Sequence, residues 1–518
     1  MIKDILNKKL IVLLLGVGLT LTSCFEDDSK EGQPISDITI ADFDQSTYTM
    51  VSYTGQKLEI NPSIETGYPE SDLEYLWTIV PVQNSYGLTE YEQPTEISTE
   101  KNLSYEVKLA ADTYTICLKV SAKSNGYAVT KTAKLIATTQ FSQGFYILKE
   151  TTDGNSDLDL LLKDGTFSEN MLAQSQEEGA MKGAPVNLTI AYAHNYINPE
   201  TNKISGTNMI CVATDQRKIS AFRSTDLKEI YNQDNMFYGT FGDDEIPYGI
   251  QTGMFDTHYF SNKGVCSVIM NVFNGSYYSG KYGTSPVQTG GSTYIVYNNM
   301  NSIYWDQDGH NFYQVDYNGG ITLVTESDGT ELQLSNYECV GAGSNTYAGA
   351  LFILQDKTTK ERVVYELDAY SATFTAKYNV DSSKHVAKSD IVRVNAQQGY
   401  YIYSVDDNKL YGYDWTSGDE KEMALQGIGS GETINYVSNQ YIAPGRFGSM
   451  SDEFDYLVIG TKSGNNEYHL YFYNMVGGQP DGQPILKASG TGRVNNVRFI
   501  TPKFSMMDAM YGNWVTVD

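Results

Sequence analysis

The segment Gly399–Asp414, GYYIYSVDDNKLYGYD, contains the structural unit from which most of this chain is built. Its two halves alternate apolar and polar residues, and between them lies the polar run Asp406-Asp407-Asn408. Two alternating segments joined by a short Asp/Asn turn predict a β-hairpin. Similar patterns recur from about residue 144 to about residue 504. The repeat therefore predicts a fold made of many small antiparallel sheets.

The second strands of these hairpins recur at fairly regular intervals. Their centres lie roughly 43 to 60 residues apart, which is close to the repeat of a β-propeller, where each small sheet buries its faces against the neighbouring blades. We expect seven blades, with six or eight as alternatives, and we expect Val494–Ile500 to complete the first blade. A β-solenoid and two stacked sandwiches are the competing folds. The strand centres are Leu160, Ile219, Tyr277, Ile321, Val364, Leu410 and Leu470.

The composition also favours an all-β protein of more than one domain. The 518 residues include 41 Tyr and 46 Gly but only 13 Pro and 5 His. Aromatic side chains suit pleated strands, and glycines suit the turns between them. The formal net charge of −27 repels polyanions, so nucleic acid is excluded as a main partner.

The first 23 residues have the pattern of an export signal. Three lysines precede the apolar run Leu10–Leu21, which is shorter than the roughly 20 residues that span a bilayer. The run ends in Leu21-Thr22-Ser23-Cys24, which resembles the lipobox of bacterial lipoproteins and implies lipid attachment at Cys24. An ordinary secretory signal is the alternative. The acidic run Phe25–Glu31 resembles the export tag of surface lipoproteins in gut anaerobes that carry SusC/SusD uptake systems. The resemblance implies a protein anchored by lipid to the outer membrane, at the cell surface.

Residues 37–140 predict a β-sandwich, because six short alternating segments occupy about 100 residues. Trp77 lies in the middle of one predicted strand, and Asp112–Val120, DTYTICLKV, resembles the penultimate strand of PKD domains. The whole unit resembles the PKD-like domain of surface lipoproteins encoded beside SusC/SusD pairs, which implies a spacer. The predicted strands are Thr47–Tyr53, Lys57–Ile60, Leu73–Ile79, Leu103–Leu109, Tyr114–Ala122 and Tyr127–Ala137.

The predicted organisation is a signal peptide at 1–23, an acidic tether at 24–36, a PKD-like sandwich at 37–140 and a propeller at 141–518. The four cysteines beyond Cys24 are far apart and lack the spacing of metal or redox sites. We expect buried free thiols, with a disulfide as the alternative outside the cytoplasm. These cysteines are Cys117, Cys211, Cys266 and Cys339.

The uneven spacing of the repeat predicts insertions in three blades, at Thr166–Ala191, Tyr231–Asn262 and Ser417–Asp452. The second insertion is rich in aromatic residues. Phe237, Tyr238 and Phe241 are candidate ligand-binding residues, because exposed rings stack on sugars or bury peptide side chains. Alternatively, these rings pack the insertion onto its blade.

Three further aromatic residues are candidates for a stacking surface. Tyr304 and Trp305 precede Asp306–Asn311, DQDGHN, which resembles half a calcium loop but lacks the third acidic position and the distal Glu. We therefore expect a turn there and predict no metal ligand. Trp415 follows the hairpin Gly399–Asp414. The alternative for each of these rings is a place in the core.

No catalytic residue and no cofactor is predicted. The five histidines are scattered, and neither HExxH nor Gly-x-Ser-x-Gly occurs. Carboxylates are abundant, but only their separation in space would indicate glycoside hydrolysis.

By resemblance, we expect a non-catalytic accessory subunit of a SusC/SusD-like, TonB-dependent uptake complex that captures oligosaccharides or oligopeptides. Its partners would be the transporter, the lid lipoprotein and a small oligomeric nutrient, with membrane contact through the lipid alone. The alternatives are a propeller-type glycoside hydrolase or lyase, and a structural or adhesive surface protein.

Overall fold

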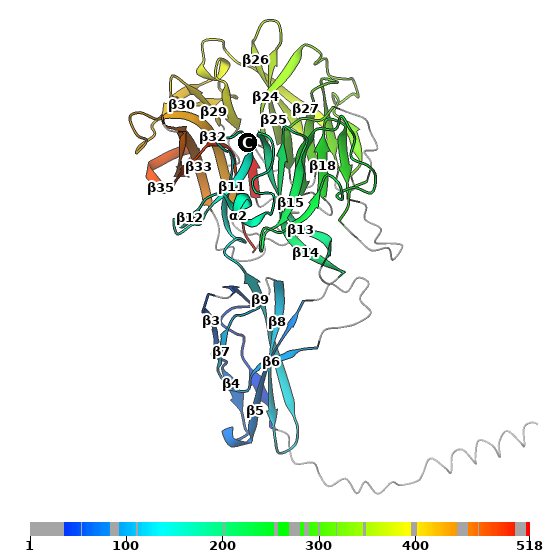
Figure 1. Ribbon diagram of the computed structural model, residues 1–518, viewed down its shortest axis with the longest axis vertical. Coiled ribbons are helices and arrows are strands. Elements are labelled where there is room, and N and C mark those ends of the chain that lie inside the picture. The colour runs from blue at the N-terminus through cyan, green and yellow to red at the C-terminus, as the bar shows by residue number, and fades with distance from the viewer. Residues whose placement is uncertain are drawn as a thin grey trace, which may run out of the picture.

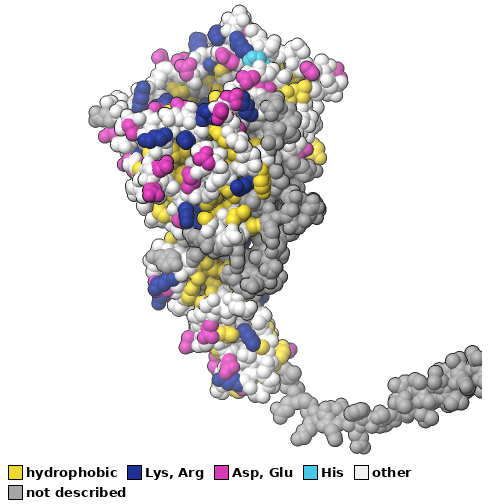
Figure 2. Space-filling model, turned by 45° about the vertical axis from the view of Figure 1, so that its right-hand side comes forward, with side chains coloured by type: hydrophobic (Ala, Val, Ile, Leu, Met, Phe, Trp, Pro, Cys, Tyr) yellow, Lys and Arg dark blue, Asp and Glu magenta, His cyan; other side chains and the backbone are white. Residues whose placement is uncertain are grey.

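The computed structural model shows a narrow N-terminal sandwich joined to a larger ring of sheets (Figure 1), and the space-filling view in Figure 2 shows the same narrow and wide parts. Residues 1–35, which hold the predicted signal, Cys24 and most of the tether, lie outside the described part of the chain. In that part, no helix is both long and apolar enough to cross a membrane. The structure describes residues 36–52, 54–82, 93–109, 112–199, 202–252, 257–268, 280–283, 290–298, 301–316, 319–344, 349–394, 401–442, 454–464, 466–502 and 514–517.

The sandwich packs a five-stranded sheet, in the order β2-β9-β8-β5-β6, against the strand pairs β1-β4 and β3-β7. All six predicted strands are present, whereas three short strands, β1, β4 and β6, were not predicted because three or four residues carry little periodicity. The strands are β1 (Ile38–Ile40), β2 (Thr47–Val51), β3 (Lys57–Ile60), β4 (Ile64–Thr66), β5 (Leu73–Pro81), β6 (Thr95–Ser98), β7 (Leu103–Glu106), β8 (Asp112–Ala122) and β9 (Ala128–Thr138).

Trp77 on β5 lies at the centre of this core, as predicted. Its side chain is fully buried, and its indole N–H donates to the Glu100 carbonyl at 3.0 Å. The ring of Phe43 packs against it with centroids 5.7 Å apart. The apolar ring of Trp77 is therefore packed in the core, and its polar N–H has a hydrogen-bond acceptor.

The chain enters the sandwich at one end and leaves it at the other. Ser36 packs against Gly67, and the neighbouring Tyr68 hydroxyl accepts a hydrogen bond of 2.8 Å from Asn125 in the β8–β9 turn. From that turn, β9 runs for 11 residues to Thr138, where the connection to the ring begins. At about 3.3 Å per residue, the two ends are separated by roughly 35 Å.

The remaining strands form a propeller, in which small antiparallel sheets, or blades, surround a common centre (Figure 1). The described strands of this part make seven sheets, and their innermost strands lie next to one another around the centre. From the innermost strand outward, the first blade has β36 (Arg493–Ile500), β10 (Gly144–Glu150), β11 (Ser156–Leu161) and β12 (Phe167–Ser168); the second has β13 (Pro185–Asn198), β14 (Lys203–Thr214), β15 (Ile219–Arg223) and β16 (Glu229–Asn232); the third has β17 (Pro247–Thr252), β18 (Thr257–Ser261) and β19 (Gly264–Ser267).

The later blades have the same arrangement. The fourth has β20 (Ile295–Asn298), β21 (Asn301–Asp306), β22 (Asn311–Val315) and β23 (Ile321–Leu323); the fifth has β24 (Tyr337–Ser344), β25 (Gly349–Asp356), β26 (Arg362–Asp368) and β27 (Thr373–Asn379). The sixth has β28 (Ile391–Val394), β29 (Tyr401–Asp406), β30 (Lys409–Asp414) and β31 (Glu420–Met423); the seventh has β32 (Thr433–Ile442), β33 (Phe454–Lys462), β34 (Glu467–Val476) and β35 (Gln479–Thr491).

The first blade closes the ring by combining strands from both ends of the propeller. β36 pairs with β10 in an antiparallel register from Gly144 opposite Ile500 to Glu150 opposite Arg493. The prediction that Val494–Ile500 completes the first blade is therefore confirmed. The register shifts between Leu148 and Lys149, and such a β-bulge changes the direction of the neighbouring side chains.

The predicted hairpin is also confirmed over its described part, Tyr401–Asp414. β29 and β30 pair up to Asp406 opposite Lys409, and the two turn residues Asp407 and Asn408 have φ values of 50° and 59°. Two positive φ values at the centre of a two-residue turn are typical of type I′, which Asp and Asn tolerate.

The other predicted strand centres mostly fall in the third strand of a blade, which is where Leu160, Ile219, Val364, Leu410 and Leu470 lie. Ile321 instead belongs to an outermost strand, and Tyr277 lies outside the described residues.

The predicted insertions are only partly loops. Thr166–Ala191 contains α2 (Met171–Ser175) and the start of β13, and the other two ranges also contain strands. The long spacing arises partly from long strands, since β13 and β14 have 14 and 12 residues. The distance between two strand centres is the same whether the extra residues lie in an inserted loop or in longer strands, so the sequence spacing could not distinguish the two.

The last described strand, β37 (Trp514–Val517), lies at the centre of the ring (Figure 1). It pairs with the inner edge of β32, from Ile442 opposite Trp514 to Asn439 opposite Val517, and also lies close to β24. The seventh blade therefore has a fifth strand on its central side.

Candidate functional site

The aromatic segment around Phe237 packs onto the third blade. Tyr282 donates its backbone N–H to the Met236 carbonyl at 2.9 Å, and Tyr238 donates to the Tyr282 carbonyl at 3.0 Å. The Phe237 ring meets the Tyr259 ring edge-on, with centroids 4.8 Å apart. These contacts fix the segment as an outer addition to the blade.

Only one of the three candidates in this segment is largely exposed. Tyr238 is 56% exposed, whereas Phe237 and Phe241 are half-buried. The Arg217 guanidinium lies 5.7 Å from the Phe241 ring centroid, in a cation–π contact. The Tyr238 ring is thus largely at the surface, while Phe237 and Phe241 act chiefly as packing residues.

Tyr304, Trp305 and Trp415 are core residues, with exposures of 0%, 2% and 3%. Trp305 packs edge-on against Phe312 at 4.9 Å, and Tyr304 stacks on Tyr313 at 5.7 Å. A ring buried on both faces presents no stacking surface, so the structure corrects the interpretation of these three residues as ligand contacts.

The turn Asp306–Asn311 joins β21 to β22, as expected for a turn. The Asp306 carboxylate accepts the backbone N–H groups of Asp308 at 3.0 Å and Gly309 at 2.9 Å. This Asx turn uses the oxygen that a calcium ion would need. Among the described residues, no three His, Cys, Asp or Glu side chains are grouped so that they could hold a metal ion.

The four cysteines beyond Cys24 are free thiols, as expected. Cys211, Cys266 and Cys339 are buried, and Cys117 is half-buried. Burial raises the pKa of Cys211 to about 12. Such a thiol is not a nucleophile at neutral pH.

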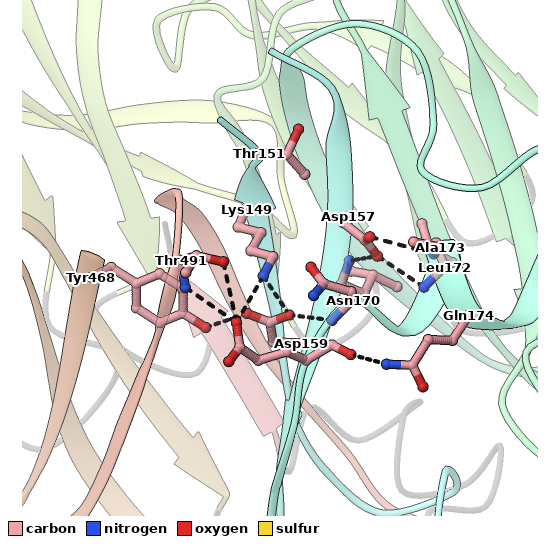
Figure 3. A network of polar contacts seen from close by, with 12 residues as sticks. Lys149, Thr151, Asp157, Asp159, Asn170, Leu172, Ala173, Gln174, Tyr468 and Thr491 are labelled. Atoms are coloured by element: carbon pink, nitrogen blue, oxygen red, sulfur yellow. Dashed lines mark hydrogen bonds and ion pairs between the residues drawn. The ribbon is translucent and has the colours of Figure 1, made fainter. Parts of the chain in front are cut away.

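A buried network of charged side chains joins the first blade to the seventh (Figure 3). Lys149 on β10 makes an ion pair of 2.8 Å with Asp159 on β11 and one of 3.5 Å with Glu169. The Tyr468 hydroxyl, on β34, donates to the other oxygen of Asp159. Burial raises the pKa of Asp159, although the charge of Lys149 and the two side-chain hydrogen bonds oppose that shift.

The same network holds the short helix α2 in place. The Asp157 carboxylate, on β11, accepts the N–H groups of Leu172 at 2.9 Å and Ala173 at 3.3 Å (Figure 3). Asp159 accepts the N–H of Asn170 at 2.7 Å. The two aspartates thus satisfy donors that the first turn of a helix leaves unpaired.

A lysine, a tyrosine and three carboxylates are groups that also perform acid–base catalysis. Here Lys149, Asp159 and Tyr468 are fully buried, and Glu169 has a side-chain exposure of 35%. A substrate cannot reach the first three, so the network is structural and fixes the ring closure. The sequence analysis did not identify this network, because Lys149 and Tyr468 are far apart along the chain. The one signal in the sequence was Lys149 itself, a charged residue within an otherwise apolar strand.

Polar side chains of the inner strands make hydrogen bonds to backbone N–H and carbonyl groups at the edges of neighbouring blades. Val497 on β36 donates its N–H to the Tyr436 hydroxyl at 3.0 Å, and its carbonyl accepts from the Gln440 amide at 2.9 Å. Between the second and third blades, Asn187 donates to the Tyr248 carbonyl at 3.0 Å. Buried backbone groups need such partners, which explains polar residues in strands that are otherwise apolar.

Two arginines lie on inner strands on either side of the seventh blade, Arg393 on β28 and Arg498 on β36. Arg498 Nη1 shares the Val497 carbonyl with Gln440, at 3.4 Å, and Arg393 Nη1 donates to the Val392 carbonyl at 2.8 Å. Burial lowers the pKa of Arg498 to about 10, and the like charge of Arg393 adds to that shift while Tyr436 opposes it.

Comparison with solved structures finds remote similarities to several proteins. A quinonprotein alcohol dehydrogenase-like protein from Bacteroides thetaiotaomicron is 13% identical, with 87% of this chain and 96% of that chain covered and a TM-score of 0.40. The Dos1 propeller is 11% identical, with coverages of 73% and 92% and a TM-score of 0.36. Apo AztD from Citrobacter koseri is 9% identical, with coverages of 82% and 100% and a TM-score of 0.35. None of these likenesses bears on function.

No curated protein matches the sequence. Residues 24–185 match a model of the PKD-like family. The match covers the sandwich and continues through β10, β11, β12 and α2 of the first blade. The chain is thus a nearly all-β protein in which a PKD-like N-terminal domain precedes a propeller-like ring of sheets.

Proposed function

We propose that this protein is a non-catalytic surface lipoprotein that captures a ligand beside a SusC/SusD-like, TonB-dependent transporter. In this proposal, lipid on Cys24 anchors the chain, the PKD-like domain is a spacer, and the propeller holds an oligosaccharide or oligopeptide for the transporter. The observation that carries the proposal is the path of the chain through the sandwich, which enters at one end and leaves at the other.

A domain with its chain ends at opposite poles is suited to act as a spacer. Ser36 lies by Gly67, near the β8–β9 turn. The opposite end of β9, at Thr138, leads into the ring, where the next residue, Thr139, donates to the Thr225 carbonyl. An anchor that precedes Ser36 would hold the propeller roughly 35 Å farther from the membrane than a direct attachment would. A ligand-binding propeller would gain access to large extracellular molecules from that distance.

The connection between the two domains is also held in place. Thr139 Oγ1, just after β9, donates to the Thr225 carbonyl on the second blade, and Ser142 Oγ donates to the Ser224 carbonyl at 3.5 Å. Both contacts reduce the freedom of the connection. A fixed connection supports a spacer that presents one face of the propeller in a constant direction.

The non-catalytic part of the proposal is supported by the buried position of the Lys149–Asp159–Tyr468 network. These three side chains are fully buried, and their packing serves the ring closure. The hydrolase alternative would require two accessible carboxylates roughly 5–10 Å apart.

Anchoring is tested by expressing the full chain and a Cys24→Ala variant in a host with an outer membrane. Cys117→Ala is the matched control, because it removes a half-buried thiol elsewhere. We expect the wild type and the control in the outer-membrane fraction, cleaved by protease added to intact cells, and Cys24→Ala in the soluble fraction. A wild-type chain that is soluble, or protected from protease on intact cells, would overturn the proposal.

A further inference from the structure

The inner edge of the seventh blade carries an additional strand from elsewhere in the sequence. β37 pairs antiparallel with β32, from Ile442 opposite Trp514 to Asn439 opposite Val517. β33 pairs with the other edge of β32, so β37 lies on the edge that faces the centre of the ring. The segment Asn439–Ile442 is therefore a place where the ring accepts a strand.

The inner edge of the third blade is satisfied in a different way. The Thr189 hydroxyl, on β13, accepts the N–H of Ile250 at 3.1 Å, and the Asn187 amide donates to the Tyr248 carbonyl at 3.0 Å. These side chains belong to the neighbouring blade and are fixed by its fold. At β32 the partner is instead a main chain, and a strand on a sheet edge can be exchanged for another strand.

The position of β37 shows how one extended chain fits at the centre of the ring (Figure 1). Besides its pairing with β32, β37 has Cα atoms within 8 Å of β24, the innermost strand of the fifth blade. The centre thus offers an extended chain a hydrogen-bonding edge on one blade and packing contact with another.

The chemistry of this edge selects a peptide. A strand edge presents N–H and carbonyl groups in a regular alternation, and another extended main chain repeats complementary groups at the same spacing. The hydroxyl groups of an oligosaccharide have no such repeat. Because the bonds are made by main-chain atoms, exchanging β37 for a second extended peptide keeps the hydrogen bonds and changes only the side-chain contacts.

We propose that the inner edge of β32, Asn439–Ile442, is a strand-addition site for an extended oligopeptide, and that β37 is an internal occupant which this ligand displaces. The inference rests on the proposed ligand-capturing function and selects the peptide from its two ligand classes. β37 belongs to the same chain, so its effective concentration at the edge exceeds that of a free peptide. Displacement therefore requires a ligand that pairs well with β32.

The test measures binding of a fluorescein-labelled peptide, KTVTVTVE, to the purified full chain in detergent by fluorescence anisotropy. Val515→Pro combined with Thr516→Pro is designed to release β37. Adjacent residues of a strand point their N–H groups to opposite sides, so one of the two prolines removes a donor to β32. We expect this variant to bind the probe about tenfold more tightly than the wild type, or better, because the internal competitor is gone.

Val515→Ala combined with Thr516→Ala is the matched control, because it keeps both N–H groups. It should bind the probe like the wild type. The peptide KTPTPTVE has the same charge but lacks two donors, and it should not bind the proline variant. Maltohexaose should not displace the probe. The proposal is overturned if the proline variant, with a cooperative melting transition, does not bind KTVTVTVE, or if maltohexaose displaces it.

Hydrogen exchange of the unmodified chain gives a second measurement, which does not depend on how the proline variant folds. With unlabelled KTVTVTVE well above its wild-type Kd, amides of residues 514–517 should exchange roughly fivefold faster or more, while those of Asn439–Ile442 stay protected. Unchanged exchange in 514–517 would contradict displacement. Both measurements use only the purified protein, so they can fail while transporter association succeeds, and the reverse.

Discussion

Two groups of buried charges in this propeller are organised in opposite ways. At the closure between the first and seventh blades, Lys149 is surrounded by Asp159, Glu169 and the Tyr468 hydroxyl. On the inner strands β28 and β36, Arg393 and Arg498 place like charges on either side of the seventh blade. The first group compensates its own charge and contributes to the ring closure. The second group instead donates hydrogen bonds to backbone carbonyls, those of Val392 and Val497.

The largest effect should come from removing one member of the compensated group. Lys149→Met leaves Asp159 buried without its cation, which typically costs about 3–5 kcal/mol. We expect a loss of unfolding free energy of that size in urea denaturation. Adding Asp159→Leu should recover part of the loss, because a buried ion pair can be replaced by apolar groups.

The control for this prediction is Arg493→Met. Arg493 pairs with Glu150 at the same closure, but its side chain is 66% exposed. An exposed pair contributes about 0–1 kcal/mol. If the two variants lose equal stability, burial does not distinguish the closure network from an ordinary surface ion pair.

The next prediction concerns Trp305, which the sequence suggested as a ligand contact and the structure places in the core. Trp305→Ala should lower the unfolding free energy by about 3–5 kcal/mol, as expected for the removal of a large buried ring. Thermal and urea unfolding measure the change. A loss below about 1 kcal/mol would indicate that the ring is not part of the core.

Acid should destabilise the propeller through two buried histidines. Burial lowers the pKa values of His194 and His258 to about 4, from the ordinary 6.5. The unfolded chain therefore binds protons between pH 6.5 and 4 that the folded chain excludes. The free energy of unfolding therefore has its full value above pH 6.5 and decreases as the pH drops toward 4. At pH 5 the decrease should be about 2 kcal/mol for each histidine.

Urea unfolding at pH 7.5 and pH 5 measures this difference. His258→Gln should remove about half of it, because His194 remains. A pH dependence that is unchanged in His258→Gln would show that other groups control acid stability.

The smallest effect on stability is expected for Tyr238→Ala. The exposed ring contributes little packing, so the unfolding free energy should change by less than about 0.5 kcal/mol. If Tyr238 contacts the captured ligand, the variant should lose affinity for it while folding normally. Equal ligand affinity in wild type and variant would remove this residue from the binding surface.

The fold was predictable because its signals are local. The period-two pattern and Asp/Asn turn of Gly399–Asp414 specify a hairpin, and its repetition, with the apolar segment Val494–Ile500 near the end, predicted a closed ring. The roles of Tyr304, Trp305 and Trp415 were not predictable in the same way. In a propeller both faces of a blade are covered by neighbours, so alternation along a strand does not show which rings meet solvent.

The charged groups required the assembled structure. Tyr468 reaches Asp159, the ion-pair partner of Lys149, only because the ring closes. No spacing along the sequence encodes this meeting. The sequence named Phe237 and Phe241 as candidate ligand contacts and left packing as the alternative; their rings lie 5.8 Å apart and are half-buried, which only the assembled blade could show.

The central claim, that this propeller serves a transporter at the cell surface, is tested most directly by native co-purification. The affinity tag belongs in the exposed turn at Asp328-Gly329, because β37 occupies the centre of the ring and a C-terminal tag would disturb it. After mild solubilisation of the outer membrane, the account predicts recovery of a SusC/SusD-like pair in stoichiometric amounts. Elution of the tagged chain alone, from membranes that contain such a pair, would contradict it.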